Sequence, residues 1–193
     1  NVFGFVNSPE NNNFMYFIEA TPRMRFTDRF MVSFTLHYDK NFSDYGWVET
    51  EYNDDGSMVT WFGKRDVTTV SNILNVRYIF NTNISLTLRA RHYWSMADYK
   101  DYYTLQTDGT LLPAEYDQNA DINFNALTVD LNFGWYFAPG SELSIMWKNS
   151  IYSVDQELVK NYFHDFSNTI SSPQTNGFSI RFLYFIDYLY IKK

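Results

Sequence analysis

The chain has 193 residues, a formal net charge of −7, no cysteine, and 39 aromatic residues (18 Phe, 16 Tyr and 5 Trp), which make up 20% of the sequence. The acidic balance argues against a nucleic-acid partner, which needs a basic footprint, and the lack of cysteine excludes disulfide frameworks, cysteine-ligated metals and cysteine nucleophiles. A hydrophobic content of 45% is too high for a disordered chain, and no run approaches the roughly 18 apolar residues of a membrane helix.

Seven segments alternate apolar and other residues with a period of two, as strands with two unlike faces do. In chain order they cover residues 14–24, 30–38, 73–80, 84–91, 127–137, 142–151 and 178–190. In the fourth segment, Leu86 and Leu88 belong to one face, while Thr87 and Arg89 belong to the other. No segment carries a convincing helical stripe of eleven residues or more. The sequence therefore predicts an all-β fold.

Short and long connections alternate between these strands. Residues 25–29, 81–83 and 138–140 are expected to form hairpin turns. The other connections are long and cover residues 39–69, 95–122 and 152–176. This order is typical of a transmembrane β-barrel with short periplasmic turns and long extracellular loops. We therefore expect an antiparallel β-barrel in the outer membrane of a Gram-negative bacterium, with a periplasmic C-terminus.

Charge and aromatic residues are distributed as this prediction requires. The three long connections hold 16 of the 22 acidic residues and 5 of the 15 basic ones, a net charge of −11. A lipid-facing surface must stay apolar, and the apolar faces of the seven strands carry almost no charge. Aromatic residues gather near both ends of the strands, for example Trp135 at a short turn and Trp94 at a long connection, as in two membrane girdles. Core packing in a β-sandwich is the alternative interpretation.

The number of strands indicates that this barrel is larger than the chain. Seven strands leave two open edges, which a bilayer does not tolerate. An eighth strand would have to precede residue 14, where only residues 2–6 are apolar, and a crossing takes roughly 9–11 residues. We expect residues 1–193 to form the C-terminal portion of a larger barrel. A small eight-stranded barrel with a short first strand is the alternative.

Basic and acidic residues face one another on the expected lumen side of the strands. They are Glu19, Arg77, Arg89, Arg91, Asp130, Lys148, Arg181 and Asp187. They have two interpretations. They form a selectivity lining for an anionic solute, or they form a network in which charges pair across strands or against a plug, because buried charges persist only when paired.

The long connections contain a second set of candidates, for ligand binding: Asp54, Asp55, Asp98, Tyr99, Tyr102 and Tyr103. Tyrosine rings can stack on a sugar while carboxylates accept its hydroxyl protons, and carboxylate oxygens also suit Ca²⁺. A solvated hairpin that turns at residues 54–57, between strands 47–52 and 58–62, explains the first two residues without a site and is the favoured interpretation. The sequence has neither a Gly-x-Ser-x-Gly nor a His-Glu-x-x-His motif and no EF-hand spacing. We therefore expect no catalytic residues and no required cofactor or metal, with Ca²⁺ at the acidic loops as the only candidate.

Several stretches resemble a known family: residues 75–80 (NVRYIF), 89–94 (RARHYW), 137–148 (FAPGSELSIMWK) and the C-terminal run 184–193. The chain is similar, over roughly residues 72–193, to a Bacteroidota outer-membrane group of unknown function. Members of that group pair an N-terminal carbohydrate-binding module, similar to family-nine xylan binders, with a C-terminal barrel. The resemblance implies a sugar-binding module elsewhere in the same protein. Its motifs are strand patterns and a turn, so they assign no site residue.

Three functions follow as hypotheses. The first is a non-enzymatic outer-membrane anchor or scaffold linked to glycan binding or to a surface complex. Its partners would be outer-membrane lipid, the N-terminal part of the same protein, a protein partner and a glycan. The alternative is a transporter or channel for a polar or anionic solute, including a barrel like that of a TonB-dependent receptor. A surface hydrolase that acts through the acidic loops is the third.

Overall fold

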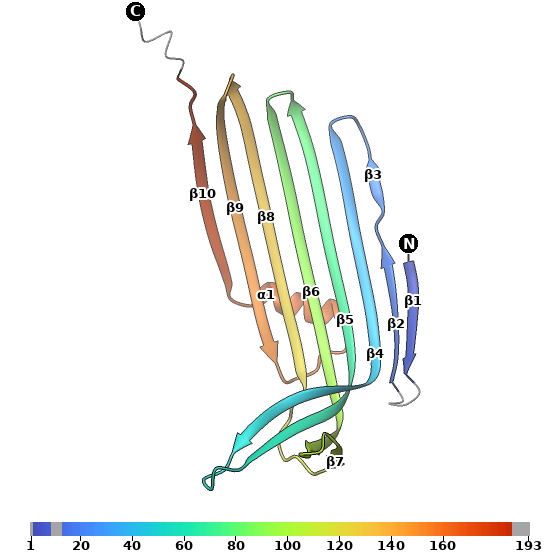
Figure 1. The fold of residues 1–193 in the computed structure, drawn as a ribbon. Coiled ribbons are helices and arrows are strands. Elements are labelled where there is room, and N and C mark those ends of the chain that lie inside the picture. The colour runs from blue at the N-terminus through green and yellow to red at the C-terminus, as the bar shows by residue number, and fades with distance from the viewer. Residues whose placement is uncertain (1, 9–12, 187–193) are drawn as a thin grey trace, which may run out of the picture.

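The computed structural model describes residues 2–8 and 13–186, which form one antiparallel sheet and one helix (Figure 1). The elements are β1 (Val2–Ser8), β2 (Asn13–Ala20), β3 (Arg23–Arg25), β4 (Phe30–Tyr52), β5 (Met58–Asn81), β6 (Ile84–Leu105), β7 (Leu111–Pro113), β8 (Ile122–Ala138), β9 (Ser141–Asp155), α1 (Tyr162–Ser171) and β10 (Gln174–Leu183). The strands lie in the order β1-β2-β4-β5-β6-β8-β9-β10, with β3 paired to β4 and β7 paired to β6. The all-β antiparallel prediction is confirmed.

The sheet is open, with β1 and β10 as its two edges. Along the path just given there are eight strands, and not the expected seven, because the short β1 pairs with β2 over its whole length. The expected strand 14–24 is divided into β2 and β3 around Pro22, which lacks the N–H needed to continue a ladder. No ladder joins β1 to β10 within residues 2–8 and 13–186, so closure into a barrel remains a prediction.

The strands extend well into the segments that were expected to be long loops. β4, β5 and β6 have 23, 24 and 22 residues, and in the first of these segments only residues 53–57 turn between two strands. The segment 95–122 contains the end of β6 and the short β7, and the segment 152–176 contains α1. The sequence predicted the hairpin that turns at residues 54–57 between β4 and β5. It missed the rest of these extensions, because backbone pairing continues a strand where apolar and polar residues do not alternate regularly.

The hairpin turns at the other end of the sheet lie where they were predicted. Asn81 supports the β5–β6 turn, because its side-chain oxygen accepts hydrogen bonds from the backbone N–H groups of Asn83 and Ile84, at 2.8 and 2.9 Å. Gly140 closes the β8–β9 turn with a φ of 71°, a conformation that glycine adopts without steric cost.

The helix α1 was not predicted, because its ten residues are shorter than the stripe that was sought. Asn161 caps its N-terminus by accepting a 3.0 Å hydrogen bond from the N–H of His164. Among the residues that the structure describes, no helix is long and apolar enough to cross a membrane.

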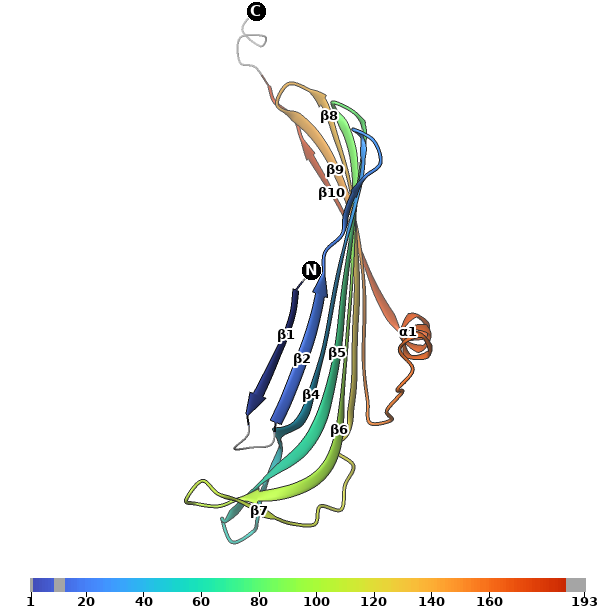
Figure 2. The ribbon, with the colours of Figure 1, turned by 90° about the vertical axis from the view of Figure 1, so that its right-hand side faces the viewer.

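The two faces of the sheet differ sharply in polarity. One row of residues paired across the strands is apolar: Val32, Val76, Leu88, Leu131, Trp147 and Phe178. The next row is polar and points to the other face: Ser33, Asn75, Arg89, Asp130 and Lys148. The helix lies on the convex side of the bowed sheet (Figure 2). Because α1 contacts His92, which shares a face with Leu88, the apolar row is convex and the polar row is concave.

The buried core lies between this convex face and the α1 segment. Val70, Trp94 and Met96 form the buried cluster, and Leu158 and Tyr162 pack against it from the helical side. Elsewhere the convex apolar face is open: Phe178 and Ile180 on β10 are 77% and 72% exposed.

The far ends of β4, β5 and β6 form a distal arm, which we define as residues 44–65 and 99–117. A bulge between Asn41 and Asp44 marks its root, with Ser43 at a φ of 57°, a conformation unusual for any residue other than glycine. Beyond this point the strands bend toward the concave side of the sheet (Figure 2). The arm therefore overhangs the polar face.

Candidate functional site

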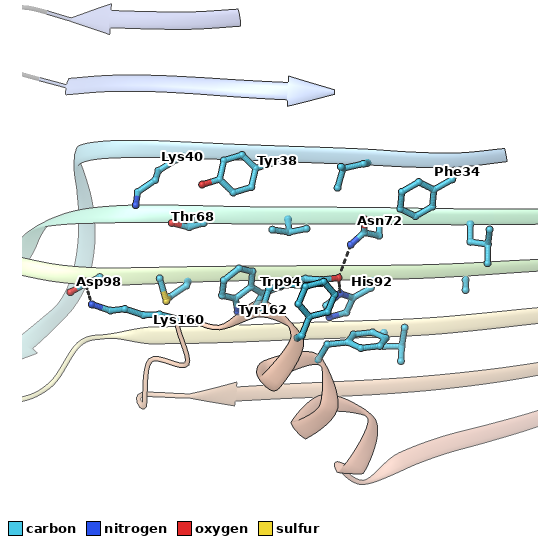
Figure 3. A pocket seen from close by; sticks show the side chains of 18 of the residues that line it. Phe34, Tyr38, Lys40, Thr68, Asn72, His92, Trp94, Asp98, Lys160 and Tyr162 are labelled. Carbon is cyan, nitrogen blue, oxygen red and sulfur yellow. Dashed lines mark hydrogen bonds and ion pairs between the residues drawn. The ribbon is translucent and has the colours of Figure 1, made fainter. Parts of the chain in front are cut away.

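A groove of about 890 Å³ runs between α1 and the convex face of the sheet. Figure 3 shows its polarity changing along the strands, from apolar residues near Phe34 to charged ones near Lys40 and Lys160. Asp98 lies at the charged end, where its carboxylate contacts the ammonium nitrogens of Lys100 at 2.6 Å and Lys160 at 3.7 Å. The groove is therefore amphipathic, with its charged end toward the distal arm.

Tyr162 holds α1 against the sheet at the centre of this groove (Figure 3). Its hydroxyl accepts a 2.7 Å hydrogen bond from the Asn72 amide and lies 2.9 Å from Nδ1 of His92. Nε2 of His92 lies 3.3 Å from Oδ1 of Asn125. With these partners the His92 imidazole is neutral. Its Nδ1 accepts a hydrogen bond from the Tyr162 hydroxyl, and its Nε2 donates one to Asn125. Burial raises the pKa of Tyr162, so the phenol keeps the proton that it donates.

A second chain of hydrogen bonds links α1 to the strands. The Trp94 indole donates to Oδ1 of Asn123 at 2.7 Å, and the Asn123 amide donates to Oδ1 of Asp165 at 2.6 Å. Asn123 and Asp165 are 2% and 3% exposed. Because each polar group would be costly to bury without its partner, the two chains define one docked position of the helix.

The predicted lumen residues lie on the concave face but do not form a single cluster. Asp130 contacts Arg91 at 2.9 Å and Lys148 at 4.0 Å. Arg77 and Arg89 line a hollow of about 350 Å³ together with Asp130, and neither arginine forms an ion pair within residues 2–8 and 13–186. The concave face thus carries an excess of positive charge around this hollow.

The remaining lumen candidates lie apart from the hollow. Arg181 pairs with Glu142 at 3.1 Å near the β10 edge, and Glu19 lies 3.6 Å from His37 near the other edge. Asp187 lies outside the described residues. Arg181 is 70% exposed, and such exposed pairs contribute at most about 1 kcal/mol to stability.

The six loop candidates lie in three different places. Asp54 and Asp55 are in the exposed β4–β5 turn, where the Asp55 carboxylate accepts a 2.9 Å hydrogen bond from the Ser57 N–H. Hydrogen bonds from Ser57 lower the pKa of Asp55, as expected of a carboxylate that stabilises a turn. Asp98 lines the α1 groove. Tyr99 and Tyr102 lie on the concave side of the distal arm, whereas Tyr103 packs on the other side against Tyr45, with ring centroids 5.5 Å apart.

An aromatic cluster occupies the concave side of the arm. Tyr102 and Tyr116 have ring centroids 4.8 Å apart, Trp61 and Tyr116 are 5.0 Å apart, and Tyr99 stacks on Tyr102 at 6.0 Å. The Tyr116 hydroxyl donates a hydrogen bond to the Glu49 carboxylate. Burial and this carboxylate raise the pKa of Tyr116 to about 12. The cluster therefore places aromatic rings next to the Glu49 carboxylate. Aromatic rings together with carboxylates are the combination that the sequence suggested for sugar binding.

Arg65 and two glycines, Gly46 and Gly63, lie on the strands next to this aromatic cluster. Arg65 donates hydrogen bonds to Asp44 at 3.0 Å and to the Tyr99 hydroxyl at 2.7 Å. Gly46 and Gly63 face each other across β4 and β5. A Cβ atom at Gly46 would collide with Arg65, and one at Gly63 would collide with the Tyr99 ring. The two glycines therefore let these side chains lie flat on the strands.

The sequence interpretation missed the polar residues that dock α1 on the sheet: Asn72, Asn123, Asn125, Tyr162 and Asp165. A signal was present, because the apolar face of β8 changes from Leu127 to asparagine at positions 125 and 123. Polar residues on an otherwise apolar face indicate that another element covers them. The element that covers these residues is α1, which is separated from β8 in the chain by the whole of β9. The signal therefore did not identify it.

Comparison with known proteins identifies a family but no characterised relative. The model of the family described as a domain of unknown function (DUF5916) matches residues 2–193. The match includes the first third of the chain, where the sequence motifs were less distinctive. Neither the curated proteins nor the solved structures that were compared give a match. Because the family model covers almost the entire chain, this protein belongs to the DUF5916 family.

Proposed function

We propose that the chain is part of the wall of an outer-membrane β-barrel and acts as a non-enzymatic anchor or scaffold. The main support for this proposal is the difference in polarity between the two faces of the curved sheet. The row through Leu88 and Leu131 is apolar and convex, whereas the row through Arg89 and Asp130 is polar and concave. A water-soluble barrel has the opposite arrangement, with an apolar interior. A bilayer requires an apolar outer surface and satisfied backbone groups.

The dimensions of the convex face fit a bilayer crossing. The apolar stripe on β8 runs from Leu127 to Phe137, eleven residues, against the roughly 9–11 that a tilted strand needs. Charged side chains on this face begin beyond the stripe, at Lys40, Asp66 and Asp98. In this proposal the short-turn end is periplasmic and the distal arm is extracellular.

The helix α1 fits the outer rim of such a crossing. It lies at the arm end of the apolar stripe, and it exposes Phe163 at 80% and Ile170 at 49%. A short helix with outward apolar residues suits the boundary between headgroups and acyl chains. Outer-membrane lipid is accordingly the first proposed partner.

Two open edges call for further pairing in a membrane, because unpaired N–H and C=O groups are costly in lipid. We propose that strands outside β1–β10 pair with both edges, as in the C-terminal portion of a larger barrel. The alternative is direct pairing of β1 with β10 in an eight-stranded barrel.

The overhanging arm supports a role at the cell surface. Its cluster of Trp61, Tyr99, Tyr102 and Tyr116 with Glu49 offers stacking surfaces and an acceptor for a glycan or a protein partner. The hollow beside Arg77 and Arg89 favours the second candidate, a channel or transporter for an anionic solute. The hydrolase hypothesis has less support, because Asp54 lies in the turn at the tip of the arm and Asp98 lies in the α1 groove. At the usual rise per strand residue the two carboxylates are about 30 Å apart.

The membrane proposal is tested by labelling neighbouring residues on opposite faces. The chain has no cysteine. In a full-length protein without other cysteines, Leu131→Cys and Asn132→Cys therefore each supply a single thiol, and both variants are reconstituted in lipid vesicles. We expect a membrane-impermeant maleimide to react with Asn132→Cys and not with Leu131→Cys. Reaction at residue 131, together with protein that stays dispersed without detergent, contradicts the proposal.

A further inference from the structure

A second cavity, of about 230 Å³, lies between α1, β8 and β9. Almost all of its lining residues carry side-chain oxygen atoms, among them Asn123, Ser153, Asp155, Glu157, Asp165 and Thr169. It lies on the convex side of the sheet and is separate from the α1 groove.

Two complementary surfaces form this cavity. Asp165, Asn168, Thr169 and Ser172 follow one another at helical spacing and thus share one face of the α1 segment. The facing wall comes from β8 and β9, where Asn123 pairs with Asp155 and Asn125 pairs with Ser153. Oxygen-bearing side chains therefore meet from both sides.

The carboxylate of Asp165 is buried and is only partly satisfied by hydrogen bonds, so it is the group that most needs a ligand. It is 3% exposed, and its only side-chain hydrogen bond within the described residues is the one that Oδ1 accepts from Asn123. Its other oxygen, Oδ2, is buried and has no hydrogen-bond partner among those residues. A carboxylate in this state must take up a proton or a cation, because an unpaired buried charge is strongly unfavourable.

The surroundings favour a cation over a proton. A proton on Oδ2 would neutralise Asp165 alone and would leave the other carboxylates of the cavity without a counter-charge. No lysine or arginine lines the cavity, while Asp155 and Glu157 add two further carboxylates. Neither of these two forms an ion pair in residues 2–8 and 13–186.

Neutral oxygens would have to complete the ligand set. No three of the described His, Asp and Glu side chains converge closely enough to hold a metal by themselves. Ca²⁺ takes six to eight oxygens, including amide and carbonyl oxygens and water. Thr169 donates its hydroxyl proton to the backbone oxygen of Asp165, at 3.0 Å, which leaves its lone pairs available.

We propose that this cavity binds a divalent cation of the Ca²⁺ type, with Asp165 as its central carboxylate ligand. The ion would join α1 to the β8–β9 hairpin and so stabilise the docked helix. With few charged ligands, the affinity should fall in the range of roughly 10⁻⁴–10⁻³ M that extracellular Ca²⁺ modules show. This inference does not depend on the membrane proposal, because it rests on the cavity alone.

Terbium luminescence tests the proposal on the full-length protein in detergent. Tb³⁺ replaces Ca²⁺ in oxygen sites and is excited by nearby indoles, and the Trp94 indole is linked to Asp165 through Asn123. We expect a Tb³⁺ signal that Ca²⁺ displaces, and an affinity that falls about 10-fold or more in Asp165→Asn. Asp155→Asn, on an exposed residue, should weaken binding without affecting folding. Asp28→Asn, in the exposed short turn between β3 and β4, is the matched control.

Two results would overturn the inference. One is a folded protein without a Ca²⁺-displaceable signal. The other is a signal that Asp165→Asn and Asp155→Asn leave unchanged. If Asp165→Asn does not fold, Asp155→Asn compared with Asp28→Asn decides the question, and thermal unfolding with and without Ca²⁺ provides a second measurement.

Discussion

The phenol of Tyr162 on α1 accepts a 2.7 Å hydrogen bond from the amide of Asn72 on β5, ninety residues earlier in the chain. This contact and the neighbouring one to His92 bring the helix onto a sheet face that is otherwise apolar. The contact joins the only described helix to the centre of the sheet, and it makes the docking of α1 testable by a single substitution.

Tyr162→Phe should loosen α1 without changing the sheet. The substitution leaves the Asn72 amide and Nδ1 of His92 without their Tyr162 partner in a largely buried groove, which costs about 1–3 kcal/mol. Hydrogen exchange should speed up in residues 162–171 and remain unchanged in β5 and β6. Tyr152→Phe is the control, since Tyr152 is 63% exposed. Equal exchange in both variants would show that the phenol does not hold the helix.

Gly63→Ala should disrupt the aromatic cluster of the arm. The new Cβ atom collides with the Tyr99 ring, and such overpacking costs about 1–3 kcal/mol. We expect faster proteolysis of the arm and a changed near-ultraviolet circular dichroism spectrum. Adding Tyr99→Ala should relieve the collision. Gly177→Ala is the control, because a Cβ at Gly177 meets no atom within 4 Å.

Tyr116 should ionise at an unusually high pH. Its pKa is raised to about 12 by burial and by Glu49, against about 10 in an unfolded chain. The sign of the pH dependence follows from linkage: the raised pKa stabilises the folded arm fully below pH 10, and this contribution is lost as the pH rises toward 12. Absorbance titration of the native protein minus that of Tyr116→Phe should show one late-titrating tyrosine. A difference centred near pH 10 would contradict the assignment.

Arg77→Glu with Arg89→Glu separates the two leading functional proposals. If the concave hollow conducts anions, reversing its charge should reduce or invert the ion selectivity of the full-length protein in a planar bilayer. Arg25→Glu is the control, because Arg25 lies at the short-turn end and pairs with the exposed Asp28. An unchanged current, or no current in either protein, favours the anchor or scaffold.

Much of the strand framework could be predicted from the sequence, because alternation has a local cause. Leu86 and Leu88 must share a face that Thr87 and Arg89 do not, whatever the strand packs against. The turns at Asn81 and Gly140 were also local, since a side-chain acceptor and a left-handed glycine act within a few residues. The residues of the candidate sites were less predictable. Lys64 pairs with Asp101 and Arg65 with Tyr99, so Lys100 is an extra residue that shifts the alternation of β6. Tyr99 and Tyr103 therefore lie on opposite sides of the arm.

The sequence by itself determined that this protein is an antiparallel β protein with one apolar face, one charged face and tight turns at one end. These properties depend on residues two or three positions apart. Only the tertiary structure decided that the apolar face is convex, because curvature arises from the twist and pairing of all the strands together. It also decided the length of β4–β6 and the position of α1. Both depend on partners distant in sequence, such as Asn72 for Tyr162 and Asn123 for Asp165, which no local pattern specifies.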